Sequence, residues 1–150
     1  MPSLFPTGRH RHMQQLLYQR FLRSPTIKAL SDTGTSWIGV PNDILNNILW
    51  QTKGWWDGNR RLYIVECSTI PNLPPMLFRI AGLKFTVPSE QYVLDLNIGN
   101  GQCVLAVFPV EAGAFKTQFV LGQPFLRTYC QTYDMKNKRI GFSIARPQRM

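Results

Sequence analysis

Acidic residues are scarce in this sequence. It has 8 Asp and Glu against 17 Lys and Arg, which gives a formal net charge of +9. The first 31 residues contain no acidic residue, and their basic residues are Arg9, Arg11, Arg20, Arg23 and Lys28. Such a surplus suits nucleic acid, an anionic membrane or simply a basic surface. The basic residues do not alternate with aromatic residues along one face, and no recognisable nucleic-acid-binding motif is present. The sequence therefore does not favour a nucleic-acid partner.

Long apolar runs are also missing. No stretch of eighteen apolar residues exists, so no transmembrane segment is predicted. Residues 1–11 lack the apolar centre of a secretory signal, so no export signal is expected from this sequence. The chain has 150 residues, 44% of them hydrophobic, and shows no repeat or low-complexity segment. This composition is typical of one globular domain with a sizeable core.

Cysteine and histidine are few. The cysteines Cys67, Cys103 and Cys130 and the two histidines have no spacing typical of metal ligands, so neither a metal nor a cofactor is expected. Cys130 stands in an alternating apolar and polar pattern. That pattern favours a buried, unreactive thiol over a nucleophile.

The charge distribution places a boundary near residue 26. Residues 1–26 would be a basic leader, and residues 27–150 the domain. Within the leader, residues 13–23 have apolar side chains at helical spacing, which predicts a short amphipathic helix docked on the domain. Attachment of that helix to a membrane surface is the weaker alternative.

From residue 27 onward the pattern is that of an all-β domain, mostly antiparallel, with two short helices. The helices are predicted over 43–51, with Asn42 as the cap, and over 124–127. A loop is predicted over 55–59. Extended segments or strands are predicted over 37–40, 61–67, 76–80, 84–87, 102–107, 119–122, 129–134 and 139–145.

The most informative segment is Asp32-Thr33-Gly34-Thr35-Ser36, in which a carboxylate sits in a turn of small residues after an apolar stretch. The pentapeptide alone is short enough to recur by chance. It can equally be an Asx or Ser/Thr turn that closes a strand. A second apolar segment, Val120-Leu121-Gly122, lies most of a domain downstream. If these two segments meet in the fold, Asp32 is a candidate catalytic carboxylate. If they do not, the turn that closes a strand is the better interpretation.

Three segments occur in a recognisable order: Asp32-Thr33-Gly34-Thr35-Ser36-Trp37-Ile38-Gly39-Val40-Pro41, Cys67-Ser68-Thr69-Ile70-Pro71-Asn72-Leu73-Pro74, and the stretch from Phe119-Val120-Leu121-Gly122 through residues 133–142. Together they resemble the carboxy-terminal lobe of the pepsin-like aspartic endopeptidases, peptidase family A1, over residues 29–145. The resemblance implies one lobe of a two-lobed enzyme. The family's first lobe, with its own Asp-Thr-Gly turn and flap tyrosine, has no counterpart in this sequence.

The resemblance implies hydrolysis of peptide or protein substrates by two carboxylates that share a proton and hold one water. Two carboxylates about 3 Å apart cannot both ionise, so one acts as acid and the other as base. Asp32 would be one of the pair. Gly34 would let the substrate backbone approach, and Thr35 would offer its hydroxyl to the bound peptide.

Supporting roles follow in the same way. The resemblance implies that Thr33 hydrogen-bonds toward the opposite lobe and that Ser36 gives weaker support. Val120, Leu121 and Gly122 would pack beneath the turn and hold it rigid. Gln123 stands where the family commonly carries Asp. We expect little catalytic consequence, with the loss of a local acceptor or salt bridge.

The resemblance also implies a disulfide between Cys67 and Cys103, which leaves Cys130 over. A disulfide suggests an oxidising compartment, and the family suggests a secreted or lysosomal protein. Both conflict with the missing signal sequence.

Two functions remain open. In the first, the chain is the second lobe of an aspartic endopeptidase and completes its dyad with another lobe or as a symmetric homodimer. In the second, it is a catalytically incompetent remnant or a module that binds peptides or proteins.

Overall fold

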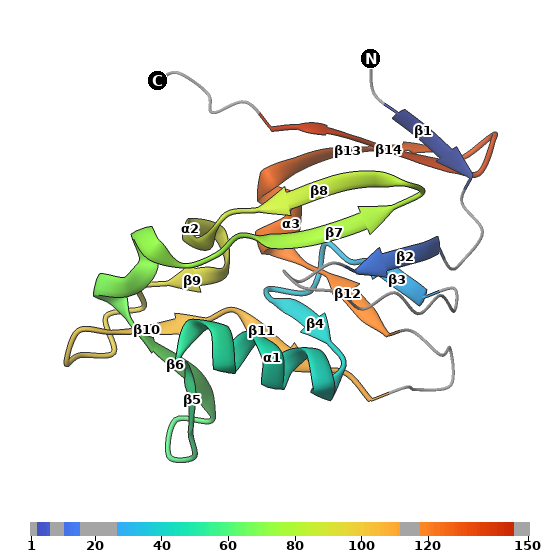
Figure 1. Cartoon of the computed structure of the whole chain (residues 1–150). Helices are drawn as coiled ribbons and strands as arrows, with labels where there is room; N and C mark the ends of the chain where they lie inside the picture. The colour runs from blue at the N-terminus through green and yellow to red at the C-terminus, as the bar shows by residue number, and fades with distance from the viewer. Residues whose placement is uncertain (1–2, 7–10, 16–26, 112–117, 146–150) are drawn as a thin grey trace, which may run out of the picture.

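The computed structural model of the chain describes residues 3–6, 11–15, 27–111 and 118–145. Over these ranges the chain is mostly β-structure with a few short helices, which confirms the all-β class (Figure 1). The helices are α1 (Asn42–Thr52), the 3-10 helix η1 (Cys67–Asn72), α2 (Ser89–Tyr92) and α3 (Gln123–Thr128).

The strands form three sheets. The largest contains, in spatial order, β11 (Val107–Pro109), β4 (Ile38–Val40), β12 (Phe119–Leu121), β3 (Ile27–Ser31), β2 (Arg11–Gln15), β7 (Met76–Ile80) and β8 (Leu83–Val87). A four-stranded sheet contains β5 (Trp55–Asp57), β6 (Leu62–Glu66), β10 (Gln102–Leu105) and β9 (Val93–Leu94). A three-stranded sheet contains β1 (Ser3–Pro6), β14 (Arg139–Ile144) and β13 (Tyr129–Asp134).

Most neighbouring strands run antiparallel, and two pairs in the largest sheet are parallel. These are β11 with β4 and β12 with β3. Figure 1 shows the three-stranded sheet at the top of the molecule and α1 at the bottom, with the largest sheet between them. The parallel pairing of β12 with β3 matters most for function, because the segment Asp32-Thr33-Gly34-Thr35-Ser36 follows β3.

An aromatic cluster forms the part of the core that anchors α3. Phe125 is fully buried. Its ring lies 5.1 to 6.0 Å, centroid to centroid, from four other rings, those of Phe78, Phe85, Tyr129 and Phe142. Aromatic pairs at such separations add to the free energy of burial. Because α3 begins directly after β12, this cluster holds the end of β12 in place.

Helix α1 forms nearly where the sequence predicts it, with a different start. Asn42 is the first helical residue and Pro41 occupies the cap position, with no side-chain capping bond. The predicted cap was therefore wrong. Proline is compatible with this position because its fixed φ suits the start of a helix. The N–H that proline lacks would have no intrahelical acceptor there. Leu45 and Ile48 are buried.

Two other expectations differ from the structure. The loop predicted over 55–59 contains strand β5, in which Trp55 pairs with Ile64 of β6. Cys130, predicted to be buried, is exposed. Successive residues of a strand point to opposite faces. Tyr129 packs against the core, so its neighbour Cys130 faces away from it.

Residues 3–6 and 11–15 form strands that pair with the predicted domain. Strand β1 pairs with β14, and β2 lies between β3 and β7. The helix predicted over 13–23 was wrong at its start, because residues 13–15 belong to β2, whose backbone pairs with two neighbouring strands. The remainder, 16–23, lies outside the described residues. The boundary near residue 26 stays a prediction.

Candidate active site

The turn that contains Asp32 lies against the segment Val120-Leu121-Gly122. Strands β3 and β12 are parallel, with Leu121 opposite Ser31. The register continues one residue further, because the backbone N–H of Asp32 donates to the carbonyl of Leu121 over 3.2 Å. The structure therefore brings together the two segments on which the interpretation of the pentapeptide depends.

Gly122 is where the two segments approach most closely. A Cβ atom at this position would lie 2.1 Å from the carbonyl oxygen of Trp37 and 2.4 Å from that of Thr35. Both contacts are with backbone atoms, which cannot move aside like a flexible side chain. The next residue continues the contact, since the N–H of Gln123 donates to the same Thr35 carbonyl over 3.0 Å. Only glycine fits at this junction.

Both carboxylate oxygens of Asp32 accept hydrogen bonds from its own turn. The Thr35 hydroxyl donates to Oδ2 over 2.6 Å, and the Gly34 N–H donates to Oδ1 over 2.9 Å. These two donors, with Thr35 the stronger, hold the pKa of Asp32 below its ordinary value. Donors to a carboxylate stabilise its charged form. Asp32 is therefore an ionised acceptor at neutral pH.

No cation neutralises Asp32 within the part of the chain that the structure describes. The one ion pair found among those residues joins Arg60 to Asp57. Asp32 itself is half-buried, next to the exposed residues Thr33 and Gly34. Its charge is thus held by uncharged hydrogen-bond donors, and its carboxylate is not consumed by a salt bridge.

The remaining predicted site residues have different surroundings. Thr35 already donates its hydroxyl proton to Asp32, so toward a peptide that oxygen can only accept. Thr33 and Ser36 are exposed. Neither of their side-chain hydroxyls has a hydrogen-bond partner among the described residues. The site roles predicted for Asp32, Gly34, Thr35, Thr33, Ser36, Val120, Leu121 and Gly122 stay predictions.

Two features beside this turn were not predicted from the sequence. The side-chain amide of Gln123 donates to the carbonyl of Thr33 over 3.0 Å, although only the loss of an interaction was expected there. Ser31, directly before Asp32, hydrogen-bonds to Gln131 and Tyr133 of β13. The available signal was a serine between an apolar stretch and the acidic turn, but nothing in the sequence shows which strand its side chain meets.

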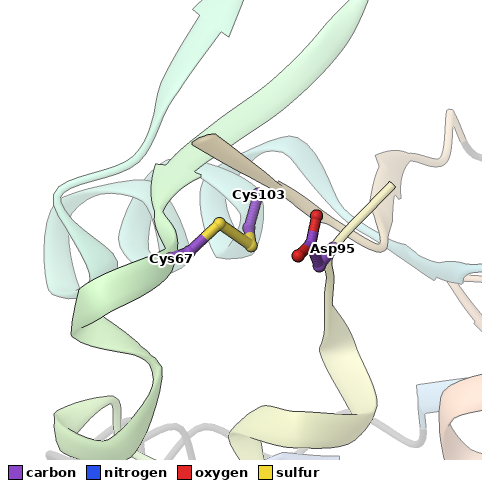
Figure 2. Close-up of side chains that lie close together, drawn as sticks. All are labelled: Cys67, Asp95 and Cys103. Carbon is purple, nitrogen blue, oxygen red and sulfur yellow. A yellow bond between two sulfur atoms is a disulfide. The ribbon is translucent and has the colours of Figure 1, made fainter. Parts of the chain in front are cut away.

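A cluster of possible metal ligands lies elsewhere, at Cys67, Asp95 and Cys103. Their ligand atoms lie within 4.8 Å of one another (Figure 2). The two sulfur atoms are bonded to each other, which confirms the disulfide between Cys67 and Cys103. A disulfide sulfur is not the thiolate that binds metals. Only the Asp95 carboxylate remains as a ligand, so this cluster does not make a metal site.

The described helices are all too short, or too polar, to cross a lipid bilayer.

Comparison with known proteins agrees with this geometry. Residues 12–145 match the family described as eukaryotic aspartyl protease. The chain is 48% identical over 118 residues to aspartic protease 1 of Caenorhabditis elegans, and 36% identical over 120 residues to human gastricsin. Each match covers 79% of this chain and 30% of the relative. The chain belongs to the eukaryotic aspartyl protease family.

A solved structure supports the fold. The crystal structure of the aspartic proteinase from Irpex lacteus superposes with a TM-score of 0.76 over 97% of this chain and 47% of that protein, at 20% sequence identity. The chain therefore spans about a third of the length of the curated relatives above and less than half of this structural neighbour.

Proposed function

We propose that this chain supplies one half of the active site of an aspartic endopeptidase, with Asp32 as one of two catalytic carboxylates. One observation supports this most directly. The Asp32 turn is seated on Val120-Leu121-Gly122, and both of its carboxylate oxygens are oriented by donors of the same turn. A carboxylate held in this way is preorganised for proton transfer.

The hydrogen bonds to Asp32 favour its charged form, so Asp32 acts as the base. It takes a proton from a water molecule as the water oxygen attacks the carbonyl carbon of the peptide bond. The second carboxyl group comes from another lobe or from a second copy of the chain. It carries the shared proton and donates it to the carbonyl oxygen. Two close carboxylates divide their roles in this way because they cannot both be charged.

The neighbouring residues bind and support. Gly34 has no side chain, and a Cβ there would lie 3.3 Å from Oδ1 of Asp32, so glycine keeps the carboxylate accessible to a substrate backbone. The Thr35 oxygen can accept a hydrogen bond from a peptide N–H while its own hydroxyl proton stays directed at Asp32. Thr33, exposed beside them, hydrogen-bonds toward a second lobe, and Ser36 contributes weaker support. The apolar Val120 and Leu121 keep the turn rigid from below.

A second carboxylate is required, and this sequence contains a single Asp-Thr-Gly turn. We propose that residues 27–150 correspond to the carboxy-terminal lobe, preceded by a basic leader up to residue 26. The second carboxylate comes from an amino-terminal lobe, in the same polypeptide or in a partner, or from a second copy of this chain. The disulfide and the family favour the secretory pathway or the lysosome.

Reconstitution tests this proposal. The oxidised chain is assayed at acid pH for cleavage of a denatured protein, alone over a range of concentrations and mixed with the amino-terminal lobe of C. elegans aspartic protease 1. We expect cleavage that pepstatin inhibits and that Asp32→Asn abolishes. The matched control is Asp95→Asn, which changes an exposed carboxylate outside the site.

The concentration dependence identifies the source of the second carboxylate. Activity of the chain alone that rises with the square of its concentration indicates a homodimer. Activity only in the mixture indicates a separate lobe. Cleavage that survives Asp32→Asn, or no cleavage in either arrangement from folded protein, overturns the proposal.

The single Asp-Thr-Gly turn also favours a second candidate, a non-catalytic module that binds extended peptides. A folded monomer that binds a denatured protein or peptide without cleaving it, even with the added lobe, supports this candidate. Pepstatin binding by a dimer argues against it.

A further inference from the structure

Ser31 lies at the end of β3, beside strand β12. On one edge of β3, strand β12 pairs as far as Ser31, opposite Leu121. On the other edge, the register with β2 runs from Ile27 to Ala29. Backbone pairing with β12 therefore reaches the end of β3. Ser31 is the last residue of the strand and precedes Asp32 directly.

Side chains from a distant strand contact this end of β3. The Ser31 hydroxyl donates to Oε1 of Gln131 over 2.6 Å, and the Tyr133 hydroxyl donates to the same oxygen. The hydroxyl oxygens of Ser31 and Tyr133 lie 2.9 Å apart. Each hydroxyl has one proton to donate, so two hydrogen bonds to Oε1 of Gln131 link the three side chains into one cluster. It joins two strands that are separated by 100 residues and belong to different sheets.

The amide nitrogen of Gln131 is the remaining polar atom of the cluster. Nε2 of Gln131 is buried and has no hydrogen-bond partner among the described residues. Reversing the amide would let Nε2 donate to the hydroxyl oxygens, but it would leave the carbonyl oxygen in the same unpartnered position. A buried polar atom without a partner costs stability, and apolar side chains could join these strands without that cost. Such costs are expected where function demands a particular geometry.

We propose that Ser31, Gln131 and Tyr133 are positioning residues for Asp32. By holding the Ser31 backbone from β13, they set the direction in which the Asp32 carboxylate leaves the strand. That direction determines whether Oδ2 meets the Thr35 hydroxyl and Oδ1 meets the Gly34 N–H. The catalytic meaning of this positioning rests on the proposed function of Asp32. The positioning itself is measurable in the chain alone.

The test is a carbon-13 NMR titration of the Asp32 carboxyl group in the whole oxidised chain. Ser31→Ala and Tyr133→Phe each remove one hydroxyl of the cluster. Tyr133 is half-exposed, so its variant keeps the fold even if Ser31→Ala does not. In both variants we expect the pKa of Asp32 to rise by about 0.3 units or more toward its reference of about 3.9, because the turn's donors no longer align. Ser31→Thr retains a hydroxyl and should restore the wild-type value.

Tyr129→Phe is the matched control. Tyr129 lies on the same strand, and its hydroxyl hydrogen-bonds to the backbone N–H and carbonyl of Thr86, away from Ser31. This variant should lose stability without moving the pKa of Asp32. The proposal is overturned if Tyr133→Phe leaves that pKa unchanged, or if Tyr129→Phe shifts it equally.

The titration separates this inference from the proposed function, because it requires no cleavage. An unchanged pKa in the two cluster variants, together with cleavage that depends on Asp32, overturns the positioning role alone. A shifted pKa in a protein that never cleaves supports the cluster and overturns the catalytic role of Asp32.

Discussion

Gln123 and Thr33 are joined by a hydrogen bond in which the Gln123 side-chain Nε2 donates to the Thr33 carbonyl over 3.0 Å. The backbone N–H of Gln123 also donates to Thr35. One residue at the start of α3 therefore holds two carbonyls of the turn that carries Asp32. Gln123 therefore makes an interaction where the sequence predicted only the loss of one.

Gln123→Glu tests this bond, because it keeps the shape and removes the donor. At neutral pH the carboxylate would face the Thr33 carbonyl, so we expect a loss of about 1 kcal/mol in the free energy of unfolding. The protonated carboxyl group can again donate to the Thr33 carbonyl. Because this bond stabilises the neutral form, it raises the folded-state pKa of the glutamate. The difference from wild type in the free energy of unfolding should therefore shrink as the pH falls below the reference pKa of glutamate, about 4.3. Urea unfolding across this range measures both effects, and an equal loss at every pH would contradict the assignment.

Gly122→Ala should be severely destabilising, since its Cβ would lie 2.1 Å from the Trp37 carbonyl oxygen. The backbone of one segment must move, and we expect a loss of at least about 3 kcal/mol in the free energy of unfolding. Gly58→Ala is the control, because a Cβ there meets nothing closer than Trp56 Nε1 at 3.7 Å. Thermal unfolding of both variants checks the prediction, which fails if they are equally stable.

Thr35→Val should raise the pKa of Asp32. The substitution keeps the size of the side chain and removes the hydroxyl that donates to Oδ2. The carboxyl group then titrates closer to its reference of about 3.9. Thr33→Val removes a neighbouring exposed hydroxyl with no bond to Asp32 and should leave this pKa unchanged. Carbon-13 titration of both variants decides whether the Thr35 hydroxyl is responsible.

Acid should destabilise the fold from about pH 4 downward. The folded-state pKa values of Asp32, Asp57 and Asp134 are all lowered, mainly by the hydrogen bonds from Thr35, Arg60 and Asn137. A carboxyl group with a lowered folded-state pKa contributes stability above its unfolded pKa and loses it as pH falls through the folded value. Urea unfolding should therefore show a decline that is shallower in Asp134→Asn. A decline of the same slope in that variant would exclude Asp134 as a contributor.

Removing the disulfide should destabilise the chain by about 4 kcal/mol in the chain-entropy estimate. Cys67 and Cys103 are 36 residues apart, so their bond restricts a long loop of the unfolded chain. The double variant Cys67→Ala, Cys103→Ala is compared with Cys130→Ala, which removes an exposed thiol. We expect a large loss for the first and little change for the second in denaturant unfolding. Comparable losses would contradict this origin of the stability.

Much of the fold follows from local pattern. The hairpin of β13 and β14 and that of β7 and β8 form where alternating residues flank a turn. The second of these turns passes through Ala81 and Gly82, both with positive φ. The errors occur where neighbours outweigh local preference. Trp55 and Trp56 lie in a strand because their backbone pairs with the edge of β6. Residues 13–15 pair between two strands instead of starting a helix.

The candidate site also has a part that local sequence patterns predict and a part that depends on the tertiary structure. Its residues were identifiable from sequence because a carboxylate in a turn of small residues, and an apolar segment ending in glycine, are local patterns. Their meeting was not, because it depends on the parallel register of β3 with β12, formed by segments about ninety residues apart.

The sequence by itself determined most of the strands after residue 27, where their hairpin turns occur and which acidic residue is a candidate for catalysis, because these depend on neighbouring residues. Only the tertiary structure decided which strands pair, that Cys130 faces away from the core, and that Ser31 meets Gln131 and Tyr133 beside Asp32. Those contacts join residues far apart in the chain. They form only when burial of the common core brings separate strands into register.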